Sequence, residues 1–250
     1  MQPRPRMAKR FISSIRNRKR LPLRKPNTAA MSAHLIDLGT CRYGEALELQ
    51  RRLHADVRDG RCPDTWIVVE HPPVITLGRQ AKSENVLLDR GELARRGIDI
   101  ANVERGGDVT YHGPGQLVVY PIRRMERFRE VVPLVRALEG AVIDVCARFD
   151  VVAERWAEHA GVWVGPNQIC AIGLAIRQMT SMHGIAFNVT TALDYDRAIV
   201  PCGLPARGIT SLARESALPV SVADAKRVLL EELARTFDVD FQPYAPALAS

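Results

Sequence analysis

The stretch RGGDVTYHGPGQLVVYPI (Arg105–Ile122) decides how the rest of the chain is interpreted. Glycine fills four of the ten positions from Gly106 to Gly115, and glycine is used where backbone must approach a neighbour closely or adopt positive φ. The run that follows, Gln116–Ile122, has the composition of a β-strand. Phosphate-binding glycine loops open a helix or end in Gly-Lys-Ser/Thr, so this segment does not indicate a nucleotide site.

Two interpretations of the segment remain. It is either a glycine-rich hairpin with a hydrogen-bonded histidine, or one wall of a binding site. Arg105, Tyr111 and His112 stand beside bare backbone, a combination that can lie along an extended ligand and offer donors at one end. We favour the binding site.

Working outward, the chain alternates short strands with irregularly placed helices. Helical spacing of apolar residues predicts helices over 43–57, 87–96, 133–149 and 222–237. β-rich or alternating runs predict strands over 35–38, 65–70, 74–77, 98–104, 116–122, 162–164, 169–176 and 182–189. This pattern predicts an α+β fold with a mixed or antiparallel sheet and flanking helices, not a regular βαβ array.

Charge separates the first 30 residues from the remainder. The chain has a net charge of +7, but residues 1–30 hold ten basic side chains and no acidic one. The other 220 residues carry 25 basic and 28 acidic side chains. We therefore expect a basic, disordered extension (1–30) and one folded domain (31–250) without a nucleic-acid-binding surface. A transit or interaction segment is the alternative interpretation of the extension.

Cysteine usage and hydropathy point to a cytoplasmic protein. The five cysteines form no C-x-x-C pair, so neither a disulfide framework nor a metal site is expected. No run of 18 apolar residues exists, so no membrane span is expected. Cys146 falls on the apolar stripe of a predicted helix and is interpreted as core.

Three further sites combine reactive and turn-forming residues. His71 precedes two prolines and is either a site residue or an exposed turn histidine. His183 stands before Gly184, again at a predicted strand. Cys202 lies between Pro201 and Gly203, where a tight turn would expose the thiol, and exposed thiols are often reactive. An incidental loop cysteine is the alternative.

Together these segments resemble one family, the octanoyl-[acyl-carrier-protein]:protein N-octanoyltransferases, or lipoyl(octanoyl) transferases. The resemblance runs from about residue 35 to 237. It is carried by HPPVITLGR (71–79), the opening stretch, AIGLAIR (171–177), HGIAFNV (183–189), PCG (201–203) and GITSL (208–212).

The resemblance implies the α+β fold shared by lipoate and biotin protein ligases. It implies transfer of an octanoyl group from acyl-carrier protein to a lysine of a lipoyl domain of 2-oxoacid dehydrogenases, or of the glycine-cleavage H protein. Cys202 would carry the acyl group as a thioester, and no metal or cofactor would be needed. A cytoplasmic monomer is expected. The positions that match the family's acyl-binding segments are Arg105, Gly106, Gly107, Asp108, Val109, Thr110, Tyr111, His112, Ala171, Ile172, Gly173, Gly184, Ile185 and Ala186.

One position departs from the family pattern. Gln168 stands where the family has a lysine that lowers the pKa of the cysteine and assists proton transfer. An unperturbed thiol is still about 3% thiolate at neutral pH. We therefore expect a slowed transferase, with His112 or His183 as the base. On a regular strand Cys170 would face the same side as Gln168, and we interpret it as a packing residue.

Two alternative functions rest on the same departure. One is a catalytically weakened homologue that binds acyl chains or lipoyl domains. The other is a Cys/His thioesterase that would release free octanoate without an acceptor domain.

Overall fold

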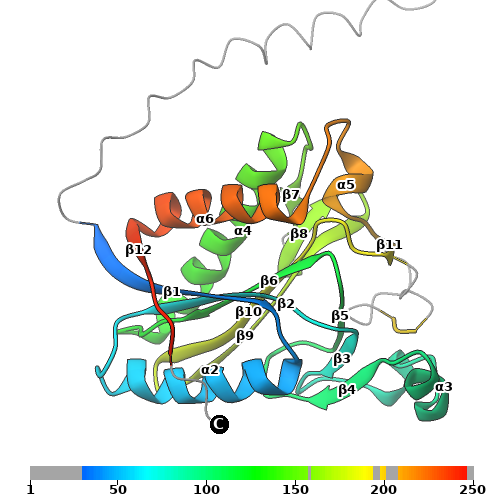
Figure 1. The fold of residues 1–250 in the computed structure, drawn as a ribbon, viewed down its shortest axis with the longest axis horizontal. Helices are drawn as coiled ribbons and strands as arrows, with labels where there is room; N and C mark the ends of the chain where they lie inside the picture. Colours follow the sequence, from blue (N-terminus) through cyan, green and yellow to red (C-terminus); the bar gives the residue numbers. More distant parts are fainter. Residues whose placement is uncertain (1–29, 157–158, 194–197, 201–207, 247–250) are drawn as a thin grey trace, which may run out of the picture. The chain divides into compact units, whose positions relative to one another are not determined.

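A computed structural model describes residues 30–156, 159–193, 198–200 and 208–246. The folded part forms a large mixed sheet and a small one (Figure 1). The nine-stranded sheet has the order β12-β1-β2-β6-β10-β9-β8-β7, with β11 paired to β9, and the three-stranded sheet has the order β4-β3-β5. The predicted α+β class with a mixed sheet is confirmed. The division at residue 30 stays a prediction, because residues 1–29 lie outside the described part.

The strands of the large sheet are β1 (Met31–Thr40), β2 (Thr65–Glu70), β6 (Gln116–Ile122), β7 (Glu154–Arg155), β8 (Gly161–Val164), β9 (Asn167–Arg177), β10 (Thr180–Asn188), β11 (Gly208–Ile209) and β12 (Val239–Pro243). The small sheet contains β3 (Val74–Leu77), β4 (Asp99–Asn102) and β5 (Val109–His112). The helices are α2 (Tyr43–Arg58), α3 (Arg90–Arg95), α4 (Val131–Arg148), α5 (Leu212–Glu215) and α6 (Val222–Phe237), with short 3₁₀ turns η1 (Ser83–Asn85) and η2 (Phe128–Glu130).

Helices cover both faces of the large sheet. The helices α4 and α6 pack on one face around Leu138, Val142 and Leu229, and α2 packs on the other through Leu49 and Leu53 (Figure 1). Each helix buries one apolar stripe, as helical periodicity requires. Cys146 is fully buried in the α4 stripe, as predicted, and burial raises the pKa of its thiol to about 12. No helix in the described ranges is long and apolar enough to cross a bilayer.

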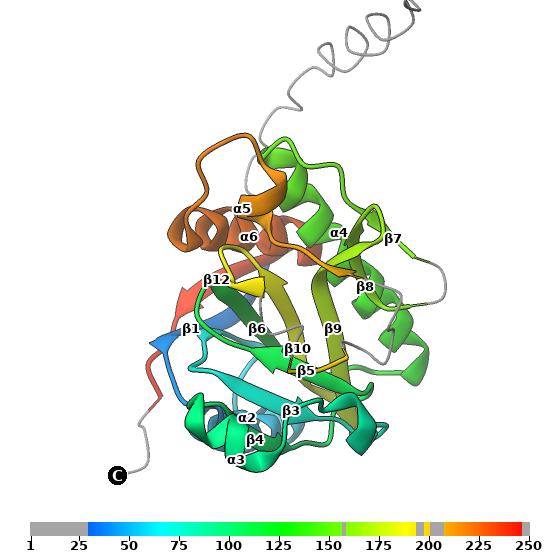
Figure 2. The ribbon, with the colours of Figure 1, turned by 90° about the vertical axis from the view of Figure 1, so that its right-hand side faces the viewer.

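The glycine-rich stretch is not a hairpin, because its two strands belong to different sheets. β5 pairs with β3, and β6 pairs with β2 and β10. Positive φ at Gly115 (+80°) lets the chain turn tightly between them. A β-carbon there would meet the Thr190 backbone at 2.7 Å. The stretch therefore carries the chain from the small sheet into the large one, with β3 and β5 beside β9 and β10 (Figure 2).

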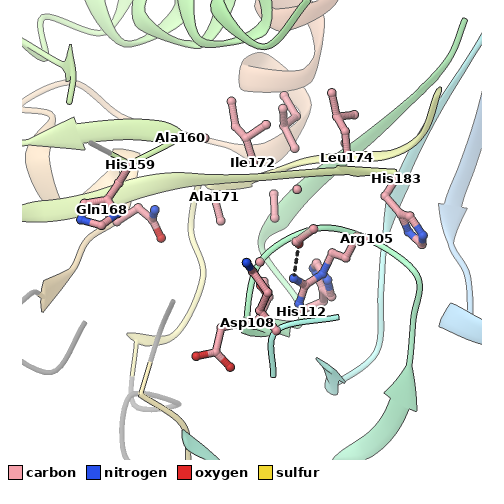
Figure 3. A pocket seen from close by; sticks show the side chains of 18 of the residues that line it. Arg105, Asp108, His112, His159, Ala160, Gln168, Ala171, Ile172, Leu174 and His183 are labelled. Atoms are coloured by element: carbon pink, nitrogen blue, oxygen red, sulfur yellow. Dashed lines mark hydrogen bonds between the residues drawn. The ribbon is translucent and has the colours of Figure 1, made fainter. Parts of the chain in front are cut away.

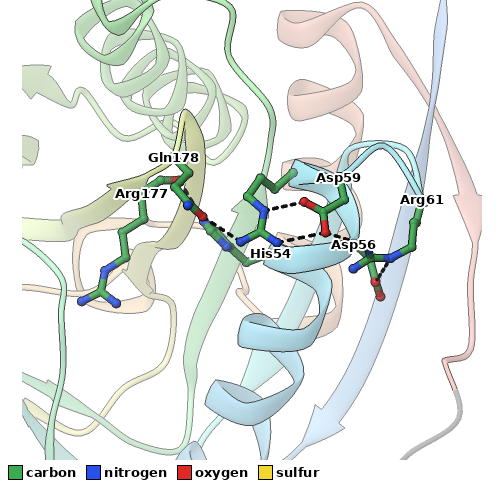
Figure 4. Close-up of polar contacts among 7 residues, drawn as sticks. His54, Asp56, Asp59, Arg61, Arg177 and Gln178 are labelled. Carbon is green, nitrogen blue, oxygen red and sulfur yellow. Dashed lines mark hydrogen bonds and ion pairs between the residues drawn. The ribbon is translucent and has the colours of Figure 1, made fainter.

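The β9–β10 hairpin turns through Gln178 and Met179, both with positive φ. Two-residue hairpin turns of this kind match the twist of the strands but favour glycine and asparagine. Contacts from α2 hold the turn: Arg58 donates to Gln178 Oε1 at 2.7 Å, and His54 Nε2 lies 3.1 Å from the Arg177 carbonyl oxygen (Figure 4). The turn thus fixes the register of the two strands that form the floor of the site.

Candidate functional site

A cleft of about 950 Å³ opens between β9, β10 and the 105–112 segment. Most predicted binding residues lie on it. Those that line it are Arg105, Gly106, Gly107, Asp108, Thr110, His112, Gln168, Ala171, Ile172, Gly173, His183, Gly184, Ile185 and Ala186 (Figure 3). The segment and the two strands, more than 50 residues apart in sequence, therefore form one site.

Val109 and Tyr111 do not line this cleft. They alternate with Thr110 and His112 along β5, so their side chains point to the other face of the small sheet. There they border a smaller neighbouring cavity, and Val109 is fully buried against Ile75. Strand alternation thus divides the predicted segment into residues that face the cleft and residues that hold the strand in place.

The 105–108 loop lies directly along the edge of β9. The Gly106 N–H donates to the Leu174 carbonyl oxygen at 3.0 Å. A β-carbon on Gly173 would lie 3.1 Å from Arg105 Cδ and 3.2 Å from the Gly106 oxygen. A bare backbone at Gly173 is therefore what allows this close approach.

Arg105 fixes the loop from within the protein. Its guanidinium donates to the Thr76 carbonyl and hydroxyl oxygens, both at 2.9 Å, and to the Gly106 oxygen at 3.0 Å. The residue is only 6% exposed. Arg105 therefore supplies a buried positive charge at the cleft wall while holding the small sheet against the loop.

Asp108 ties the loop to the segment after β3. Its carboxylate accepts from the Lys82 N–H at 3.1 Å, from its neighbour Val109 N–H at 2.8 Å, and from the Asn85 amide. Lys82 and Asn85 also line the cleft, although sequence reasoning did not single them out. A lysine and an asparagine after the HPPVITLGR segment give no signal of their own, because exposed polar residues are common in loops.

One end of the cleft contains buried histidine and tyrosine side chains. Tyr43, Tyr120, His112 and His183 line it, and the Tyr43 and His112 rings stack with centroids 5.8 Å apart. His112 Nδ1 donates to Gln116 Oε1 at 2.8 Å. Burial lowers the pKa of His112 well below its ordinary value and raises the pKa of Tyr120. This end of the cleft is therefore polar in atoms but uncharged in its histidines at neutral pH.

His183 adopts a left-handed backbone conformation, with φ +57°. Its N–H donates to Gln50 Oε1 at 2.9 Å, and its Nε2 lies 3.8 Å from a Glu104 carboxylate oxygen. Burial lowers the pKa of His183 to about 4, although the Glu104 charge acts in the opposite direction. The imidazole is therefore neutral near pH 7 and held in one orientation.

His71 is buried, not exposed, and lies behind the cleft. Its Nδ1 donates to the Cys41 carbonyl oxygen at 2.7 Å, and its Nε2 accepts from the Tyr120 hydroxyl at 2.8 Å. Burial lowers the pKa of His71. The exposed-turn interpretation is wrong, because both ring nitrogens are engaged inside the protein. His71 instead positions Tyr120.

Gln168 and Cys170 face different sides of β9, so the expectation that they share one side is wrong. The pairing of β8 with β9 shifts register between Val162, opposite Cys170, and Trp163, opposite Gln168. The irregularity inserts Ile169 without a partner and reverses the alternation. Gln168 lines the cleft, whereas Cys170 packs in the core with α4. Burial raises the pKa of Cys170 well above the ordinary value, which agrees with a packing role.

Cys202 lies outside the described residues. Of the described residues on either side of it, Val200 lines the cleft, and Ile209 pairs with Gln168 in the β11–β9 ladder. In the described ranges no group of three or more His, Cys, Asp or Glu side chains could hold a metal ion.

Comparison with known proteins now defines the family. Residues 42–234 match the family described as the lipoyl protein ligase A/B catalytic domain. A curated octanoyltransferase from Alkaliphilus metalliredigens is 41% identical over 84% of this chain and 97% of its own length. The chain belongs to the octanoyltransferase family.

Other relatives of this octanoyltransferase-family protein support the same family assignment. The octanoyltransferase of Syntrophobacter fumaroxidans is 42% identical over 84% of this chain and 92% of its own. The octanoyltransferase of Acidobacterium capsulatum is 46% identical over 74% of this chain and 81% of its own length. A crystal structure of lipoate-protein ligase A bound with ATP matches with a TM-score of 0.74 at 18% identity, covering 86% of this chain and 89% of that chain. That likeness shows the shared fold, and the predicted resemblance to the lipoate ligase fold is confirmed.

Proposed function

We propose that the protein transfers an octanoyl group from octanoyl-acyl-carrier protein to a lysine of a lipoyl domain. The acceptor would be a lipoyl domain of a 2-oxoacid dehydrogenase or the glycine-cleavage H protein. The shape and lining of the cleft carry this proposal. Its floor is apolar, from Ala171, Ile185 and Ala186, and one end contains buried, uncharged histidines and tyrosines. An alkyl chain fits such a surface, because apolar surface is removed from water without leaving a charge unpaired.

Two chemical steps complete the transfer. Cys202 gives up its thiol proton and its sulfur attacks the carbonyl carbon of the donor thioester. A new C–S bond forms, the bond from that carbon to the carrier sulfur breaks, and the carrier takes up the proton and leaves as a thiol. The acceptor lysine amine then attacks the same carbon and loses one proton as the C–N bond forms. The C–S bond to Cys202 breaks, and the Cys202 sulfur takes up that proton. The bonds broken and formed balance, because the donor arrives as an activated thioester.

The backbone of the 105–108 loop can contribute to the proposed transfer by positioning the acyl group. Its glycines bring main-chain groups to the edge of β9, beside the apolar floor. The Gly106 N–H is taken up by the Leu174 carbonyl oxygen, so a donor to the thioester oxygen that becomes negative during attack would come from another main-chain N–H of the loop. The loop would therefore orient the acyl carbonyl while the floor holds the chain.

Intact-mass analysis after incubation with octanoyl-acyl-carrier protein tests the proposal. We expect a single octanoyl adduct on the wild-type protein and none on Cys202→Ala. Cys62→Ala is the matched control, because Cys62 is half-buried at the end of α2, away from the cleft. An adduct that persists in Cys202→Ala would refute the assignment of the nucleophile. Free octanoate formed without an acceptor domain would favour a thioesterase instead.

A further inference from the structure

His159 is placed at the Gln168 end of the cleft. Both residues line the cleft, and Figure 3 shows their side chains together at one side of it. His159 comes two residues before Gly161, where a β-carbon would lie 2.9 Å from Gln168 Nε2. The segment that carries His159 is therefore in contact with the Gln168 amide.

His159 differs from the other cleft histidines in its exposure. His112 and His183 are buried, and their rings contact Gln116, Thr76, Tyr43 and Glu104. Their pKa values are lowered by burial. His159 is only half-buried, and its ring makes no hydrogen bond or ion pair with the residues that the structure describes. Imidazole is the side chain most often used as a general base, and among the three cleft histidines only this one is both partly exposed and placed beside Gln168.

Described residues on both sides of His159 are anchored in the fold. On the side of the following strand, buried Glu139 of α4 accepts from the Gly161 N–H at 3.1 Å and pairs with Arg136 at 2.8 Å and Arg155 at 3.2 Å. On the preceding side, the Trp156 ring stacks on Trp163 of β8, with centroids 4.4 Å apart and planes 9° apart. A proton-transfer group needs such fixed placement to reach its partner in the transition state.

Gln168 cannot perform this task itself. Its amide can donate and accept hydrogen bonds but does not take up a proton at neutral pH. In the second chemical step the attacking amine must lose a proton as its C–N bond forms. The cleft therefore needs a separate proton acceptor at this end.

We propose that His159 is the proton acceptor for the attacking lysine amine. This inference rests on the proposed transfer function. The amine nitrogen bonds to the thioester carbon and gives its proton to the free imidazole nitrogen. The C–S bond breaks, and the departing thiolate takes the proton from the imidazolium. The products are the amide and the free thiol, so imidazole and thiol both return to their starting forms.

A single-turnover experiment with pre-acylated full-length protein tests this role. His159→Ala should slow transfer to a lipoyl domain about 100-fold, a typical contribution of a general base, while loading from octanoyl-acyl-carrier protein proceeds as in the wild type. Discharge of the adduct by hydroxylamine should also be unchanged, because that nucleophile is already unprotonated at neutral pH. His34→Ala is the matched control, since His34 stacks on Tyr244 at the β1–β12 edge of the large sheet.

A second variant keeps the test independent of folding. Gln168→Lys added to His159→Ala should recover transfer, because a lysine at the neighbouring position restores a proton-exchanging group. Wild-type transfer by His159→Ala would overturn the inference and leave the proposed function standing. Equal slowing with hydroxylamine would overturn it too, since it would indicate a structural role. Failure of the wild-type protein to form any adduct would overturn the proposed function and this inference together.

Discussion

The backbone of Gly161 lies against the side-chain amide of Gln168. A β-carbon on Gly161 would be 2.9 Å from Gln168 Nε2 and 2.7 Å from the Cys170 carbonyl oxygen. Gly161 also has φ +136°, a conformation that side chains rarely adopt. The first residue of β8 must therefore be glycine for Gln168 to lie along the strand and reach the cleft.

Gly161→Ala should lower the free energy of unfolding by about 1–3 kcal/mol, the usual cost of forcing an atom into a packed site. Gly165→Ala is the matched control, because Gly165 belongs to the same hairpin and has positive φ but has open space around it. That control should cost about 1 kcal/mol, for the left-handed conformation alone. Urea unfolding measures both, and equal losses would contradict the crowding at Gly161.

Gln168→Lys should raise the rate of transfer to a lipoyl domain by about tenfold. A lysine at this position, unlike the glutamine amide, can exchange a proton with the attacking amine. Gln178→Lys is the matched control, because Gln178 lies at the other end of the same hairpin, in contact with Arg58. Single-turnover transfer rates decide, and an unchanged rate in Gln168→Lys would mean that this position does not handle protons.

The sequence predicts much of the fold because periodic patterns are local. The ranges predicted for α6, β2, β3 and β6 agree with the structure, and α2 ends one residue beyond its prediction. The sequence did not predict β12, because Val239–Pro243 is short and mostly exposed. Its pairing with β1 depends on tertiary contacts. The predicted helix 87–96 is shorter, because Asp89 caps it by accepting from the Glu92 N–H at 2.8 Å.

The sequence predicts the parts of the site that contain glycine-rich motifs. It does not predict side-chain orientations that depend on irregular strand pairing. The glycine density of the 105–116 segment indicates a site directly. The opposite orientations of Gln168 and Cys170 depend on an irregular β8–β9 register, which leaves no trace in an alternating strand pattern. His159 lies in an unpatterned stretch, and only the packing of β8 brings it to the cleft.

Glu139→Ala should destabilise the protein by about 2 kcal/mol. The change leaves the buried Gly161 N–H without its acceptor and removes the partner of Arg136 and Arg155. Glu231→Ala is the matched control, because its half-exposed carboxylate pairs with Arg227 on the surface and should cost less than about 1 kcal/mol. Urea unfolding gives the energies, and near-ultraviolet circular dichroism reports the Trp156–Trp163 stack. An unaltered spectrum in Glu139→Ala would argue against the anchoring role.

Stability should fall as the pH is lowered from about 6.5 towards 4, because of the buried histidines. Burial lowers the pKa of His183 to about 4, below the ordinary value near 6.5 that applies after unfolding. Between these values the unfolded chain binds more protons than the folded one, so the free energy of unfolding decreases with decreasing pH. Each unit of separation between the two pKa values contributes about 1.4 kcal/mol. His71 and His112 act in the same direction.

His183→Asn isolates this contribution, because asparagine tolerates the left-handed conformation better than most residues. Its free energy of unfolding should depend less steeply on pH between 6.5 and 4, whatever its value at neutral pH. Urea denaturation at several pH values provides the slope. The same slope in both proteins would show that His183 already binds its proton in the folded state, against the effect of its burial.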